Sequence, residues 1–286
     1  MIVASPIAIR CSGTDFPRSA TKKVYKASLE PPNPSFAADQ RPQRKLDGGQ
    51  MDFKKFLMFG DSITEFAFNT RISPESGRDE FCVGAALTNA YTRKLQVTQR
   101  GFSGYNSRWA LKLLPQILAT ERDIVIAYVF FGTNDAAMDS VQTVPLVEYV
   151  RNMTEMVPDA ARRQHQGRAR GGRRCTTPTS AARRVGNVTP GSRNNPNNKL
   201  YSDALAGVAR EQRTGFVDLH RAFSEAGGER WSDLLVDGIH YSGRGYEVFY
   251  KELMAVIDRT FPELSPDNVP FRFPNWRDVA PDGSNL

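Results

Sequence analysis

The sequence predicts an α/β fold in which helices cover both faces of a parallel β-sheet. From residue 55 onward, short apolar segments alternate with segments whose apolar residues follow helical spacing, which is typical of this class. The segment 124–131 consists of eight consecutive apolar residues, as expected for a strand that is buried on both sides. No apolar run approaches the length of a membrane-spanning helix, and 286 residues accommodate one large domain.

Each element is predicted from its own spacing of apolar residues. Strands are expected where short apolar segments precede polar or glycine-containing loops, at 56–59, 96–100, 123–131 and 214–219. Helices are expected where apolar residues recur every three or four positions, at 81–95, 109–118, 146–157, 202–211 and 243–260. No internal repeat is visible, so these elements are assigned to one domain over 51–286.

The net charge of +7 would ordinarily suggest a nucleic-acid partner, but its distribution does not support one. Residues 1–50 carry eight basic and four acidic residues, and 158–198 carry nine basic residues and one acidic residue. The rest of the chain has 21 basic and 26 acidic residues, so the folded part is expected to be mildly acidic. Three widely separated cysteines exclude a disulfide scaffold and favour a reducing, cytoplasmic location.

These two basic segments do not fit the alternating pattern. Residues 1–50 contain six prolines and no sustained periodicity, which indicates a disordered or mis-annotated N-terminal extension, with a weak mitochondrial targeting sequence as the alternative. Residues 158–198 contain no Leu, Ile, Met, Phe, Tyr or Trp, so they cannot bury enough apolar surface to become ordered. Helix and strand are expected at this position. We therefore interpret this Arg-rich segment as a frameshift or intron artefact, or else as an inserted segment.

Candidate catalytic residues lie where ligands bind in open α/β sheets, after the carboxyl ends of the strands. Ser62 follows the first predicted strand, where a serine is either a nucleophile or an ordinary helix cap. A serine nucleophile needs a base and a group that orients the base, and the loop that contains Asp237 and His240 supplies both. His220, two residues after Asp218, is the alternative base.

Further candidates could stabilise an oxyanion or line a substrate pocket. Gly104 and Asn134 follow the second and third predicted strands, where a loop N–H and a side-chain amide can donate hydrogen bonds to an oxyanion. Each signal is weak alone, because glycine and asparagine are common in turns. Phe66 and Phe68 are candidates for the substrate pocket, with core packing as the alternative.

The four motifs together resemble the blocks of the SGNH (GDSL-type) hydrolase superfamily, and in particular its isoamyl acetate-hydrolysing esterase family. The motifs are Gly60-Asp61-Ser62, Gly104, Gly132-Thr133-Asn134-Asp135 and Asp237-Gly238-Ile239-His240. The resemblance covers about 51–157 and 199–286, and the end of the Arg-rich segment is open because Arg193-Asn194-Asn195 fits either part. It implies a flavodoxin-like three-layer α/β/α fold without cofactor or metal. In that fold the strand missing from 158–198 lies between the strands at 123–131 and 214–219, so we expect the sheet to be gapped or closed by the last strand shifting inward. It also implies Ser62 as nucleophile, His240 as base, Asp237 as its orienting residue, and an oxyanion hole of Ser62, Gly104 and Asn134.

The expected function is therefore hydrolysis of short-chain carboxylic esters. The substrates expected first are acetate esters of small alcohols, such as isoamyl acetate. One alternative is a metal-dependent phosphoesterase that uses Asp61, Asn134, Asp237 and His240 as ligands. Another is a chain that keeps the motifs but is impaired by the disruption at 158–198. The expected partner is a small-molecule ester, with no nucleic acid and no membrane span, and a homodimer is left open.

Overall fold

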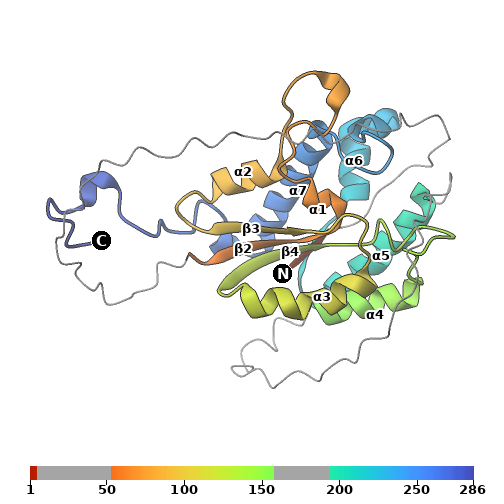
Figure 1. Cartoon of the computed structure of the whole chain (residues 1–286), viewed down its shortest axis with the longest axis horizontal. Helices are drawn as coiled ribbons and strands as arrows, with labels where there is room; N and C mark the ends of the chain where they lie inside the picture. Colours follow the sequence, from red (N-terminus) through yellow and green to blue (C-terminus); the bar gives the residue numbers. More distant parts are fainter. Residues whose placement is uncertain (5–52, 158–192) are drawn as a thin grey trace, which may run out of the picture. The chain divides into compact units, whose positions relative to one another are not determined.

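The computed structural model describes residues 1–4, 53–157 and 193–286, which belong to one compact unit (Figure 1). Its sheet has five parallel strands in the order β3-β2-β4-β1-β5. The strands are β1 (Ile2–Ala4), β2 (Lys55–Gly60), β3 (Gln96–Gly101), β4 (Ile124–Phe130) and β5 (Gly215–Val217). Four of them lie at the positions predicted from the sequence, so the parallel α/β prediction is confirmed.

Helices connect the strands, and most of them agree with the sequence pattern. The α-helices are α1 (Ser62–Glu65), α2 (Val83–Ala90), α3 (Ser107–Thr120), α4 (Leu146–Met156), α5 (Asn195–Glu211), α6 (Leu219–Gly227) and α7 (Gly243–Thr260). Helix α5 begins seven residues before its predicted start, because the Asn194 side chain caps it and Pro196 suits its first turn. Helix α6 was not predicted from the sequence. The Asp218 side chain caps it by accepting a hydrogen bond from the Arg221 N–H.

The sheet separates two apolar cores. Alternate side chains of β2 and β4 point to opposite faces, so that Phe56 and Met58 pack on one side and Leu57 and Phe59 on the other. Helices α1, α2, α6 and α7 cover the first face, and α3, α4 and α5 cover the second (Figure 1). The described helices include none that is long and apolar enough to cross a membrane.

The place of the missing strand is taken by the N-terminus of the chain. Strand β1 lies between β4 and β5, pairing Ile2 with Tyr128 on one side and with Gly215 on the other. All three β1 side chains are fully buried. An interior strand must be apolar on both faces and must satisfy the backbone hydrogen-bonding groups of both neighbours, and Ile2-Val3-Ala4 meets these requirements.

Two sequence-based expectations are therefore wrong for these residues. We expected residues 1–50 to form an extension outside the sheet, and we expected the missing strand to leave a gap or to draw the last strand inward. Neither holds, since β1 fills the interior place between β4 and β5. The expectations for 5–52 and 158–192 lie outside the described residues.

Candidate active site

Ser62 lies at the carboxyl end of β2, where it begins α1. The Asp61 carboxylate caps this helix by accepting a hydrogen bond from the Ile63 N–H at 3.0 Å. A Cβ atom at Gly60 would lie 2.1 Å from Thr64 Oγ1 and 2.8 Å from the Phe130 carbonyl oxygen, so only glycine fits here. The tight turn from strand to helix therefore depends on the Gly60-Asp61-Ser62 sequence, and it leaves the Ser62 hydroxyl at the edge of the sheet.

His240 and Asp237 form a hydrogen-bonded chain with Ser62. His240 Nε2 lies 2.9 Å from Ser62 Oγ, and His240 Nδ1 lies 2.7 Å from Asp237 Oδ2. The other oxygen of Asp237 accepts hydrogen bonds from the N–H groups of Ile239 at 3.0 Å and His240 at 2.8 Å. Asp237 thus places both the backbone and the ring of His240. The alternative base, His220, lies in the first turn of α6.

The ionisation of Asp237 suits this role. Burial alone would raise its pKa, but the hydrogen bonds from the ring and backbone of His240 outweigh burial and lower the pKa to about 2. The carboxylate is therefore charged at neutral pH and accepts a hydrogen bond from His240 Nδ1. This fixes the tautomer in which Nε2 is free to accept the proton of Ser62.

The predicted oxyanion donors follow β3 and β4, the two strands that flank β2 in the parallel sheet, so they come after the same carboxyl end of the sheet as Ser62. Gly104 follows β3 with a φ of +78°, a conformation that favours glycine. Asn134 follows β4, is 5% exposed, and donates a hydrogen bond from Nδ2 to the Tyr105 carbonyl at 2.8 Å. Within the described ranges, neither the Ser62 N–H nor the Gly104 N–H donates a hydrogen bond, so both are available to a ligand.

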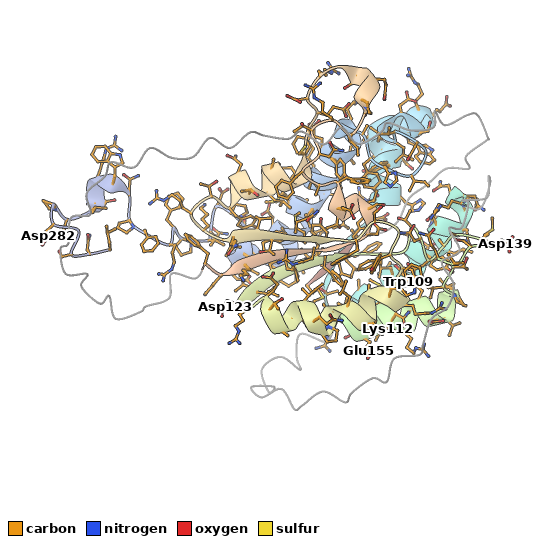
Figure 2. The ribbon with its side chains drawn as sticks, in the orientation of Figure 1. Trp109, Lys112, Asp123, Asp139, Glu155 and Asp282 are labelled. Carbon is orange, nitrogen blue, oxygen red and sulfur yellow. The ribbon has the colours of Figure 1, made fainter. Side chains whose placement is uncertain are left out.

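Aromatic rings pack against residues of the candidate site and against each other. The Phe66 ring packs edge-on against the His240 ring at 5.2 Å between centroids, whereas Phe68 packs on Gly84 of α2 and is 45% exposed. Of the two predicted pocket residues, the structure thus brings Phe66 to the candidate catalytic group. Trp109, labelled on α3 in Figure 2, packs edge-on against Tyr105 at 5.7 Å.

Arg193 and Gln142 contact the site and were not singled out by the sequence analysis. Arg193 Nη2 donates hydrogen bonds to Asn134 Oδ1 at 2.8 Å and to Gln142 Oε1 at 2.7 Å. Gln142 Nε2 in turn donates to the Gly104 carbonyl at 2.7 Å. The sequence gives Arg193 no role, because it is one of nine arginines in 158–198 and the stretch Arg193-Asn194-Asn195 fits either part of the chain.

Two buried acids close to the site have unusual ionisation. Burial raises the pKa of Asp61 to about 7, against the hydrogen bond from the Ile63 N–H. Burial likewise raises the pKa of Asp135 to about 6, although both carboxylate oxygens accept from the Ser107 N–H. The described residues contain no group of three or more His, Cys, Asp or Glu that could hold a metal ion.

Because the pKa values of Asp61 and Asp135 are raised in the folded protein, we expect its stability to depend on pH. In the unfolded chain both return to a pKa near 3.8, so between about pH 4 and 7 the folded protein binds more protons. The free energy of unfolding should therefore fall as the pH rises from about 4 to 7, by up to about 1.4 kcal/mol per pH unit for each acid, and the contribution of Asp135 should be complete near pH 6. Urea denaturation at several pH values measures this fall.

Variants of single acids identify the source of the dependence. Asp135→Asn should reduce the fall, whereas Asp139→Asn, at an exposed position labelled in Figure 2, should leave it unchanged. A free energy of unfolding that rises between about pH 4 and 7, with no change in Asp135→Asn, would contradict this assignment.

A serine, an imidazole and a carboxylate joined by hydrogen bonds at the carboxyl edge of a parallel sheet define a serine hydrolase. The comparisons with known proteins place the chain more narrowly. It belongs to the GDSL-like lipase/acylhydrolase family, whose model matches residues 58–248. The family predicted from the sequence is thereby confirmed.

Individual relatives agree with this family. The chain is 46% identical to the isoamyl acetate-hydrolyzing esterase of Saccharomyces cerevisiae over 237 residues, covering 82% of this chain and 99% of the yeast protein. It is 32% identical to the human isoamyl acetate-hydrolyzing esterase 1 homolog, covering 82% of this chain and 91% of the human one. A lipase/acylhydrolase from Enterococcus faecalis has a similar fold, with a TM-score of 0.50 at 19% identity, covering 72% of this chain and 96% of the other.

Proposed function

We propose that the chain hydrolyses short-chain carboxylic esters through an acyl-serine intermediate, with acetate esters of small alcohols such as isoamyl acetate as preferred substrates. The observation that carries the reaction type is the chain of contacts from Ser62 Oγ through His240 to Asp237, at 2.9 Å and 2.7 Å. The relatives named for isoamyl acetate hydrolysis support the substrate class.

The geometry supports the following sequence of steps. Ser62 Oγ attacks the ester carbonyl carbon while its proton moves to His240 Nε2. The negative charge that develops on the carbonyl oxygen is stabilised by the N–H groups of Ser62 and Gly104 and by the Asn134 amide. The ester bond breaks and the alcohol leaves with the proton held by His240. Water, deprotonated by the same imidazole, then hydrolyses the acyl-serine.

The metal-dependent phosphoesterase is the weaker candidate. Asp237 is engaged by the His240 ring and by two N–H groups, and one oxygen of Asp61 caps α1. The yeast and human relatives carry the name of esterases, which also favours the serine mechanism. The cytoplasmic location and the homodimer, which the sequence analysis left open, stay predictions.

Substrate and chelator assays test the proposal together. The purified chain should cleave isoamyl acetate with a higher kcat/KM than isoamyl hexanoate, and should do so equally well with and without EDTA. An aryl phosphate ester should not be cleaved. Loss of ester hydrolysis in EDTA that a divalent metal restores would contradict the serine mechanism. Faster cleavage of the hexanoate would leave the mechanism in place and contradict the acetate preference.

A further inference from the structure

We propose that Arg193 is a positioning residue of the oxyanion hole, which fixes the Asn134 amide directly and the Gly104 loop through Gln142. The inference rests on the proposed function, because it assigns a purpose to the residues that surround the proposed oxyanion donors. It adds to the site a residue near the C-terminal end of the Arg-rich segment 158–198.

Arg193 is held close to the site by burial and by its contacts. Only 6% of the residue is exposed, which is unusual for an arginine and requires polar partners. Its Nη2 atom supplies hydrogen bonds to Asn134 Oδ1 at 2.8 Å and to Gln142 Oε1 at 2.7 Å. Both acceptors are amide oxygens, so the guanidinium charge is not neutralised by either of them.

The contact with Asn134 decides which way its amide faces. A guanidinium can only donate hydrogen bonds, so the atom of Asn134 that faces Arg193 must be the oxygen. The Tyr105 carbonyl can only accept, so the atom that faces it must be the nitrogen, at 2.8 Å. These two neighbours exclude the flipped amide. Nδ2 carries two hydrogens, and the one that Tyr105 does not accept is left for the oxyanion.

The contact with Gln142 extends the same effect to the second oxyanion donor. With its oxygen held by Arg193, the Gln142 amide presents its nitrogen to the Gly104 carbonyl at 2.7 Å. The Gln142 backbone is itself fixed, because its carbonyl accepts a hydrogen bond from Asn106 Nδ2 at 2.8 Å. One guanidinium thus connects the loops that follow β3 and β4, and with them two of the three proposed donors.

The positive charge should also favour catalysis. Donors that are already oriented before the reaction stabilise a developing oxyanion without reorganising during the step. A guanidinium bound to Oδ1 withdraws electron density from the Asn134 amide, which makes Nδ2 a stronger donor. Arg193 should therefore matter more in the transition state than in the ground state, and its removal should lower kcat rather than raise KM.

Steady-state kinetics on isoamyl acetate test this inference with three variants of the full chain. Asn134→Ala should lower kcat by roughly 10²–10³, as the loss of one oxyanion donor does. Arg193→Met, which keeps an unbranched apolar stem but removes the guanidinium and its donors, should lower kcat by a smaller factor at unchanged KM. Arg193→Lys, which keeps the charge and a donor, should have an intermediate kcat. Arg230→Met is the matched control, because its side chain is 85% exposed and pairs with Asp233, and its kcat should be unchanged.

The double variant Arg193→Met/Asn134→Ala separates a positioning role from an independent one. If Arg193 acts through Asn134, adding Arg193→Met to Asn134→Ala should lower kcat much less than Arg193→Met does alone. The inference would be overturned if Arg193→Met lowered kcat by the same factor in the parent chain and in Asn134→Ala. It would also be overturned if Arg193→Met raised KM at unchanged kcat. Should Arg193→Met fail to fold in a thermal melt, Arg193→Lys and Gln142→Ala replace it. Wild-type kcat in both would then overturn the inference.

These outcomes differ from a failure of the proposed function. If Asn134→Ala leaves kcat unchanged, the oxyanion assignment itself is wrong. If Asn134→Ala lowers kcat and the Arg193 variants do not, the proposed mechanism stands and only the role of Arg193 is lost.

Discussion

Replacing Ser62 with alanine is expected to abolish ester hydrolysis while leaving the fold intact. Removal of the nucleophile from a serine hydrolase typically lowers kcat by roughly 10⁶-fold, because the general base has no hydroxyl to activate. Alanine suits the first position of α1, and the variant loses only the 2.9 Å contact with His240 Nε2. Hydrolysis of isoamyl acetate and a thermal melt, measured on the same preparation, check both parts of this expectation.

A second serine provides the matched control. Ser224 lies in α6, and its hydroxyl also makes one hydrogen bond, to the His220 carbonyl at 2.8 Å. Ser224→Ala should retain full activity. A serine-directed phosphonate should label the parent chain and Ser224→Ala, but not Ser62→Ala. Activity above about one percent in Ser62→Ala would show that another group attacks the ester.

Placing a charge in β1 is expected to unfold the protein. Val3 is fully buried in the interior of the sheet, and Val3→Asp would put a carboxylate there without a partner. The charge should displace β1, which leaves backbone groups of β4 and β5 unpaired at about 1–3 kcal/mol each. The lost burial of Ile2 and Val3 adds about 1.5–3 kcal/mol for each side chain. These costs together approach the whole stability of a typical domain, about 5–15 kcal/mol.

Thermal and urea denaturation measure this effect. Val147→Asp is the matched control, because Val147 is 84% exposed on α4, and the variant should melt as the parent chain does. With β1 in place, the parent chain should melt cooperatively, in contrast to the instability that a gap in the sheet would cause. If Val3→Asp melts like the parent chain, β1 does not occupy the interior place of the sheet.

Local patterns in the sequence predicted the strands and most of the helices from 55 onward, because each of these depends on nearby residues. The run at 124–131 predicted β4, and the glycine and polar residues after β2, β3 and β4 predicted where the candidate site would lie. The structure brings Ser62, Asp237 and His240 together at hydrogen-bonding distances, and their catalytic roles stay predictions.

Features that depend on distant residues could not be predicted in this way. Three residues of β1 carry too little periodicity to indicate a strand, and their partners in β5 are more than two hundred residues away. Arg193 could not be separated from its arginine-rich surroundings, since only its contacts with Asn134 and Gln142 distinguish it and these residues are distant in sequence. Helix α6 follows β5 immediately, without the loop that usually marks a boundary.

The position of β1 has a consequence for the order in which the chain folds. Strands β2, β3 and β4 pair with each other within residues 55–130, so this half of the sheet can form from nearby contacts. Strand β1 is synthesised before the other four strands, yet it pairs with Tyr128 and Gly215, and closing such long loops is entropically costly. Contacts this distant slow folding. An apolar N-terminal strand must therefore wait for most of the chain to be synthesised, and during that time the unpaired edge of β4 is open to pairing with other chains.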